Sequence, residues 1–201
     1  MKKFILLTVF IGLALTSYSQ RFHGGIHGGF IASQLDGDNL GGYNKAGLRG
    51  GGWVNTKISS LLTLQMELEY IQKGSKISES ELLAGGYYHS LLSYIQLPIL
   101  ARIQATENIT GEGGIAGGYL FEGLEDKDGT TFMDADPPFD EYELSLLIGL
   151  NYHFNENLTG NIRFNYSALP IREHPGGQVY WLDRGQYNNV LSFGIYYEFV
   201  Y

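Results

Sequence analysis

The last stretch of the chain, from Asn188 to Tyr201, constrains the fold most strongly, because apolar residues occupy every second position in it. A period of two residues predicts a β-strand with one apolar face. Chain ends of soluble domains are usually solvated and frayed, whereas the last strand of a closed barrel pairs with the first and leaves no sheet edge. The stretch therefore favours a closed barrel over a core strand of a soluble β-protein. Its apolar positions are Leu191, Phe193, Ile195, Tyr197, Phe199 and Tyr201.

The beginning of the chain predicts export. Lys2 and Lys3 are followed by an apolar segment from Phe4 to Leu15 and by the small-x-small triplet at residues 17–19. This order is typical of a secretory signal peptide, and the apolar segment is too short to span a membrane as a helix. We therefore expect residues 1–19 to be a signal peptide and residues 20–201 to form one barrel domain.

Composition excludes several classes of protein. A formal net charge of −8 makes the chain a poor candidate for binding nucleic acid. The sequence has no cysteine, so neither disulfides nor thiolate metal sites are expected. It implies no cofactor. Beyond the signal peptide no apolar run reaches the length of a membrane helix, so a membrane protein of this sequence must be a β-barrel.

Alternating segments recur along the whole chain and predict an eight-stranded, antiparallel, up-and-down transmembrane barrel of the all-β class. Long and short connections alternate between them, which places four long external loops at one end and three short periplasmic turns, with both termini, at the other. Lys73 is assigned to the second long loop, and Pro98 predicts a bulge or kink in the fourth strand. The predicted strands are 22–34, 45–58, 62–70, 88–104, 109–122, 141–154, 158–167 and 188–201. The predicted external loops are 36–44, 74–87, 123–140 and 170–186.

The distribution of charge indicates which face of the strands points outward. Lipocalin-like soluble barrels also alternate, but with apolar residues inside. Here the polar register carries both signs of charge in the middle of several strands, as expected when paired side chains fill a small lumen. Aromatic residues gather near strand ends, as membrane interfaces require. The charged positions assigned to the lumen register are Arg49, Lys57, Glu67, Glu69, Arg102, Glu112, Glu122, Glu141, Glu143, Arg163 and Glu198.

Four stretches occur in a fixed order along the chain: GGFIASQLDGD at 28–38, GYNKAGL at 42–48, YIQKGS at 70–75 and YIQLPIL at 94–100. Together they resemble the PorT-type outer-membrane β-barrels of Bacteroidetes, a group often labelled porins. The resemblance implies an outer-membrane barrel and an association with protein export, and it supplies no catalytic motif. The closing strand also resembles the C-terminal signal by which barrel assembly machinery recognises outer-membrane proteins. The candidates for this signal are Phe193, Ile195, Tyr197, Phe199 and Tyr201.

A luminal charge network is the main candidate site. We expect three arginines to pair with four glutamates and to block the lumen, because eight strands leave an interior barely wide enough for side chains. A non-conducting structural, interaction or export-associated barrel is therefore favoured, with external loops that meet a ligand or partner protein. A narrow pore or transporter for small solutes is the alternative. The predicted network is Arg49, Glu67, Glu69, Arg102, Glu112, Glu143 and Arg163.

Two further kinds of site were considered. Histidines at positions 23, 27, 89 and 153 could suggest a hydrolase, but no serine, base and acid are fixed together by spacing. No enzyme is expected. Two acidic turns resemble fragments of calcium loops, yet neither supplies the downstream glutamate. They are weak candidates for a divalent-cation site, with ordinary turns favoured: Asp36, Asp38, Asp126 and Asp128.

Overall fold

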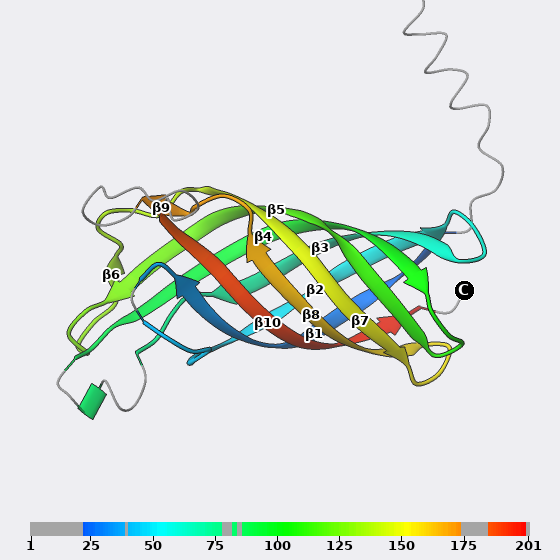
Figure 1. Ribbon diagram of the computed structural model, residues 1–201, viewed down its shortest axis with the longest axis horizontal. Helices are drawn as coiled ribbons and strands as arrows, with labels where there is room; N and C mark the ends of the chain where they lie inside the picture. Colours follow the sequence, from blue (N-terminus) through cyan, green and yellow to red (C-terminus); the bar gives the residue numbers. More distant parts are fainter. Residues whose placement is uncertain (1–21, 39, 78–81, 84–85, 174–184, 200–201) are drawn as a thin grey trace, which may run out of the picture.

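The computed structural model describes residues 22–38, 40–77, 82–83, 86–173 and 185–199. The predicted signal peptide and Tyr201 lie outside these residues. Eight long strands form a closed antiparallel barrel, with the last strand pairing to the first (Figure 1). The strands are β1 Phe22–Asp36, β2 Lys45–Lys57, β3 Leu62–Lys73, β4 His89–Gln104, β5 Ile109–Asp126, β7 Tyr142–His153, β8 Leu158–Ser167 and β10 Gly185–Glu198.

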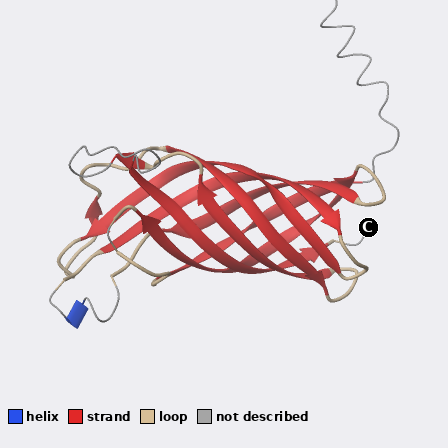
Figure 2. Ribbon diagram, in the orientation of Figure 1, coloured by secondary structure: helices blue, strands red, loops and turns tan. Residues whose placement is uncertain are grey.

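The long strands follow one another around the barrel in chain order, as a meander. Two short strands, β6 Met133–Asp134 and β9 Arg172–Glu173, extend the wall at the end opposite the C-terminus by pairing with β5 and β10 (Figure 2). Within the described residues, no helix is long and apolar enough to cross a membrane. The predicted eight-stranded up-and-down architecture is confirmed.

The seam between β1 and β10 needs glycine where the backbones meet. Gly29 pairs with Gly194, and a Cβ atom on Gly29 would lie 2.1 Å from the carbonyl oxygen of Phe193. Only a residue without a side chain allows so close an approach. Gly29 therefore serves the closure of the barrel.

Strand limits differ from the predictions mainly at the external end. Lys73 is the last residue of β3, not the first of a loop. Strand β5 continues to Asp126, where the third long loop was expected, and β10 begins at Gly185. Strands can continue beyond the membrane wherever a neighbour supplies hydrogen bonds, so the alternation of apolar residues underestimates their length.

β4 has no bulge at Pro98; the bulge lies on its neighbour β5. The register with β5 shifts between Ser93 and Tyr94, whereas Pro98 faces Ala116 without a shift. A proline removes one backbone donor but adds no residue, so the ladder can lose a hydrogen bond there and keep its register.

The bulge also corrects one assignment to the lumen. Ser93 pairs with Glu122 and Tyr94 with Leu120, which leaves Phe121 as the extra residue. An extra residue inverts the alternation beyond it, and Glu122 is exposed instead of luminal. Lys57 and Glu141, at or near strand ends, are exposed too.

The outward face forms an apolar belt, as predicted. Phe30 and Ile148 are 71% and 64% exposed, values that only a lipid environment makes favourable for so many large apolar side chains. Aromatic pairs edge this belt: Tyr119 with Tyr142 near the external end and Tyr197 with Phe199 near the periplasmic end. The exposed fractions of these apolar side chains therefore show which face of the strands is turned toward the lipid.

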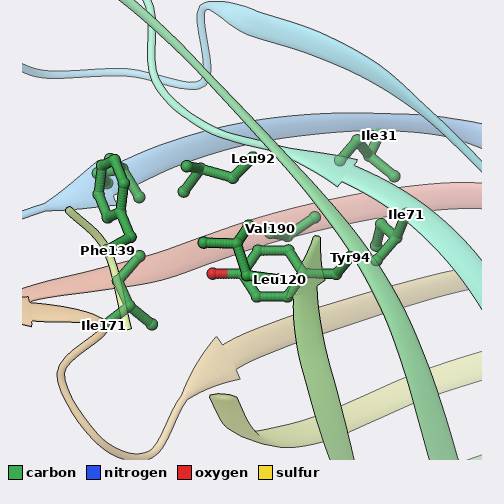
Figure 3. Close-up of a cluster of buried hydrophobic side chains, with 9 residues drawn as sticks. Ile31, Ile71, Leu92, Tyr94, Leu120, Phe139, Ile171 and Val190 are labelled. Atoms are coloured by element: carbon green, nitrogen blue, oxygen red, sulfur yellow. The ribbon is translucent and has the colours of Figure 1, made fainter. Parts of the chain in front are cut away.

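An apolar cluster fills the external half of the lumen, which the sequence analysis did not predict. Side chains from several strands meet Phe139 and Ile171, which come from the external loops and lie together at one end of the cluster (Figure 3). The barrel thus has an apolar layer as well as a polar one. The cluster consists of Ile31, Leu35, Ile71, Leu92, Tyr94, Leu120, Phe139, Ile171 and Val190.

Candidate functional site

Glu67 lies at the centre of a polar layer of buried charged side chains. The layer consists of Arg49, Glu67, Glu69, Arg102, Glu112 and Arg163. Arg163 donates to both of its oxygens, at 2.8 and 2.9 Å, in a two-pronged contact that the planar guanidinium favours. The hydroxyl of Tyr196 donates to the same carboxylate at 3.1 Å. Glu67 and Arg163 are each 1% exposed, so this contact fixes β3 to β8 across the lumen.

Arg163 also joins Glu67 to a second carboxylate. Its Nε donates to Glu112 at 2.6 Å, and Arg102 donates to the other oxygen of Glu112 at 3.1 Å. The amides of Asn151 and Asn161 each donate to Glu112 at 2.9 Å. Every charged group here meets an opposite charge and several hydrogen-bonding groups, as buried ions require.

Arg49 completes the layer. It donates to Glu69 at 3.0 Å and to the hydroxyl of Tyr196 at 2.7 Å. The ring of Tyr196 stacks on His27 with centroids 4.7 Å apart. The guanidinium groups of Arg49, Arg102 and Arg163 lie within 6.0 Å of the Tyr196 ring, in the range of cation–π contacts. The alternation showed that Tyr196 shares the polar register but gave no signal for this central position.

Glu143 does not join these groups, although it was predicted to pair with an arginine. Its partner is Lys73, whose Nζ lies 3.0 and 2.9 Å from the two carboxylate oxygens. Ser145 and Ser167 donate to the same carboxylate at 2.7 Å. Lys73 was missed because it followed the last clearly alternating residue of its strand and was assigned to a loop.

A lid of residues from the external loops covers the apolar cluster. It includes Tyr88, Pro137 and Phe139, and Arg172 contacts all three. The guanidinium of Arg172 lies 3.9 Å from the ring centroid of Phe139 and donates to the carbonyl of Pro137 at 3.0 Å. It is also paired with Glu125 at 2.7 Å and donates to the Tyr88 hydroxyl at 3.4 Å. These contacts hold three connections together over the lumen.

The contacts of the lid shift the pKa values of two of its ionisable groups, Tyr88 and Glu125. Burial, with the hydrogen bond to Glu125, raises the pKa of Tyr88, so its hydroxyl stays protonated and donates to that carboxylate at 2.6 Å. Burial acts to raise the pKa of Glu125 too, but hydrogen bonds from Arg172 and Tyr88 outweigh it and lower the pKa overall. Glu125 is therefore an ionised, buried anchor.

A polar vestibule of about 680 Å³ opens at the periplasmic end and reaches inward to Arg102. A hydrogen bond of 2.6 Å joins Nδ1 of His23 to the carboxylate of Glu198 on its wall. The other histidine there, His153, hydrogen-bonds to Thr110 at 2.8 Å. The vestibule ends at the polar layer.

The histidines considered for a hydrolase do not lie in a nucleophile site within the described residues. His89 meets Phe132 edge to face, and the neighbouring Ser90 hydroxyl donates to the carbonyl of Ser75 at 3.4 Å. Where the chain is described, no hydrogen bond joins a serine hydroxyl to a histidine.

The four acidic candidates for a cation site are not brought together. Asp126 accepts from Gly129 N at 2.8 Å, and Asp128 accepts from Thr130 N at 3.0 Å, so each carboxylate serves its own turn. Asp36 accepts from Asn189, and Asp38 from Leu40 N at 2.8 Å.

Within the described ranges, one group has the spacing of metal ligands: His27, Glu67 and Glu69. Both carboxylates are already paired with Arg49, and Glu67 with Arg163 as well. A dication there would add two positive charges beside these guanidinium groups, so the group does not fit a metal ion.

The closed barrel, its apolar belt and its buried polar interior define an integral outer-membrane β-barrel. The chain belongs to the outer membrane protein beta-barrel domain family, whose model matches residues 16–170. No curated protein matches it.

Solved structures show the same fold at low identity. Ail, the attachment invasion locus protein of Yersinia pestis, solved with the heparin analogue sucrose octasulfate, is 12% identical, with a TM-score of 0.51 over 89% of this chain and 99% of that one. Neisserial surface protein A is also 12% identical, with a TM-score of 0.52 over 89% and 97%. The protein is therefore an outer-membrane barrel.

Proposed function

We propose that this protein is a non-conducting interaction barrel of the PorT type, associated with export or with the cell surface, whose external loops meet a partner. The observation that carries the proposal is Arg163, which bridges Glu67 and Glu112 inside the lumen. Above it the apolar cluster excludes ions by a second means, since it offers them no polar ligands.

Planar bilayers containing the full-length protein test this proposal. We expect no steady conductance. The double variant Phe139→Ala, Arg172→Ala opens the lid but leaves the polar layer intact, and it should be silent too. Steady single-channel currents in the wild type would instead support the alternative, a narrow pore entered from the periplasmic vestibule.

The finer features of the proposal rest on the sequence. The pattern of residues 1–19 supports export by a signal peptide, and resemblance to known families supports membership of the PorT group and assembly through the C-terminal strand. Phe193, Ile195, Tyr197 and Phe199 lie on the lipid-facing register with exposed fractions of 40–48%, which supports their role as an insertion signal. A pull-down with the intact external loops tests for a partner, and we propose no catalytic role.

The ligand seen with Ail does not suit the external surface of this protein. Sucrose octasulfate is a polyanion, whereas exposed acidic side chains outnumber exposed basic ones on the external part of the described chain. Repulsion between like charges disfavours such a ligand. The exposed acidic residues are Glu122, Asp128, Asp134, Asp136, Asp140, Glu141 and Glu173; the exposed basic residues are Lys76 and Lys127.

A further inference from the structure

A pocket of about 470 Å³ lies among the external loops, beside the lid. Charged side chains line it from three parts of the chain: Asp38 after β1, Glu125 at the end of β5 with Lys127 and Asp136 in the connection that follows, and Arg172 in β9. Its volume lies in the range of small-ligand sites. Because Arg172 and Glu125 are fixed by the lid contacts, the pocket has a rigid floor.

Two buried carboxylate oxygens on the lining residues can accept from a ligand. Oδ2 of Asp38 has no hydrogen-bond partner among the described residues. Oε2 of Glu125 has the Lys127 ammonium as its one described partner, at 3.0 Å. Buried acceptors left without donors are costly, and a ligand that supplies donors recovers that cost. Burial raises the pKa of Asp38 above its ordinary 3.8, against hydrogen bonds from Ser75 and Leu40, as expected for a carboxylate that lacks a cation.

Lys127 shows which chemistry suits the pocket. Its ammonium lies 3.0 Å from Oε2 of Glu125 and donates to the carbonyl of Asp136 at 2.9 Å. The Lys127 side chain is 56% exposed, and an ion pair made by so exposed a lysine is weak. An ammonium held this loosely is a displaceable occupant of the site.

The lining also suits the rest of a basic side chain. Leu40 and Pro137 give the pocket apolar walls for methylene groups, and the acidic external surface attracts cations from solution. The described carboxylates of the pocket do not form a group with metal-ligand spacing. An organic cation therefore fits better than a metal ion.

We propose that this pocket binds the ammonium or guanidinium group of a basic side chain on a partner protein, in competition with Lys127. The inference deepens the proposed interaction function and rests on it. Its test measures peptide binding, whereas the test of the proposed function measures conductance. The two can therefore fail separately: the barrel can conduct and still bind the peptide, or it can be non-conducting and fail to bind it.

The test uses the full-length barrel in lipid nanodiscs and a fluorescent glycine-serine peptide with one central lysine. The matched peptide carries norleucine, which keeps the methylenes without the charge, and free N-acetyl-lysine methylamide separates a free amine from a chain-borne one. We expect the lysine peptide to bind, the norleucine peptide to fail, and the free amine to compete weakly.

Two variants give opposite expectations. Asp38→Asn should weaken lysine-peptide binding roughly tenfold, because a charged partner is replaced by a neutral one. Lys127→Met should strengthen it severalfold, since the competing ammonium is removed. Controls with the same charge changes outside the pocket, Asp128→Asn and Lys76→Met, should change binding less than twofold. Retention of heat-modifiable migration in SDS gels confirms folding of each variant.

Three results would overturn the proposal: equal binding of the norleucine peptide, unchanged or weaker binding in Lys127→Met, or equal effects of Asp38→Asn and Asp128→Asn. Tighter binding of the free amine than of the peptide would reassign the pocket to a small-molecule amine and contradict a protein partner.

Discussion

Lys73 and Glu143 form an ion pair inside the barrel, with Nζ 2.9 Å from Oε2 and both side chains at most 1% exposed. The pair joins β3 to β7 across the lumen. The ammonium also lies 4.9 Å from the ring centroid of Tyr94, a member of the apolar cluster. This pair therefore links the polar and apolar fillings of the lumen.

Removing one partner of this pair should destabilise the barrel strongly. Lys73→Met leaves Glu143 buried without its cation, which costs about 3–5 kcal/mol. The double variant Lys73→Met, Glu143→Gln should recover most of that loss, because no uncompensated charge remains. Urea unfolding in detergent micelles measures both, with Lys76→Met as the exposed control. Equal stability of the single and double variants would contradict this account.

The hydroxyl of Tyr196 should contribute separately from its ring. Tyr196→Phe keeps the stack on His27 but removes the contacts to Arg49 at 2.7 Å and to Glu67 at 3.1 Å. We expect a loss of about 1–3 kcal/mol in the free energy of unfolding, because buried charged groups lose a polar partner. Tyr197→Phe, on the lipid face of the same strand, is the matched control and should be nearly neutral.

Insertion should depend on the outward register of β10. Phe199→Asp places a charge on the lipid face, and deletion of Tyr201 removes the terminal aromatic of the proposed signal. A charge near the middle of the membrane costs about 2–4 kcal/mol when basic and less when acidic or near the interface. We expect a reduced fraction of heat-modifiable, folded protein in membranes. Normal folded levels in both variants would argue against the proposed signal.

The external lid should loosen in acid. The pKa of Glu125 is lowered from its ordinary 4.5, so its contribution to stability is fully present above that value and is lost as the pH falls through the lower folded-state pKa. Protonation weakens the pair with Arg172. Hydrogen-exchange protection of the loop around Phe139, taken relative to the intrinsic exchange rate at each pH, should therefore fall below about pH 4.5 in the wild type. The variant Glu125→Gln should show low protection at every pH; protection that still changes with pH in that variant would assign the effect to another group.

The sequence by itself determined the barrel and its orientation. A strand repeats with period two whatever its neighbours are, so segments such as Leu62–Tyr70 revealed both their conformation and their apolar face. Loop length then separated the two ends. The positions of Arg49, Glu67 and Arg163 on the polar register followed from the same alternation.

Only the tertiary structure decided which groups meet inside. Arg163 pairs with Glu67 across 96 positions of the chain, and Lys73 pairs with Glu143 across 70. Such contacts depend on strand stagger and on which side chains reach the barrel axis at the same height, and alternation carries no information about either. The bulge at Phe121, which turns Glu122 outward, has the same origin. The period-two alternation shows on which face of its strand a residue lies. The closed barrel decides the residue's position along the barrel axis and the partner that it meets there.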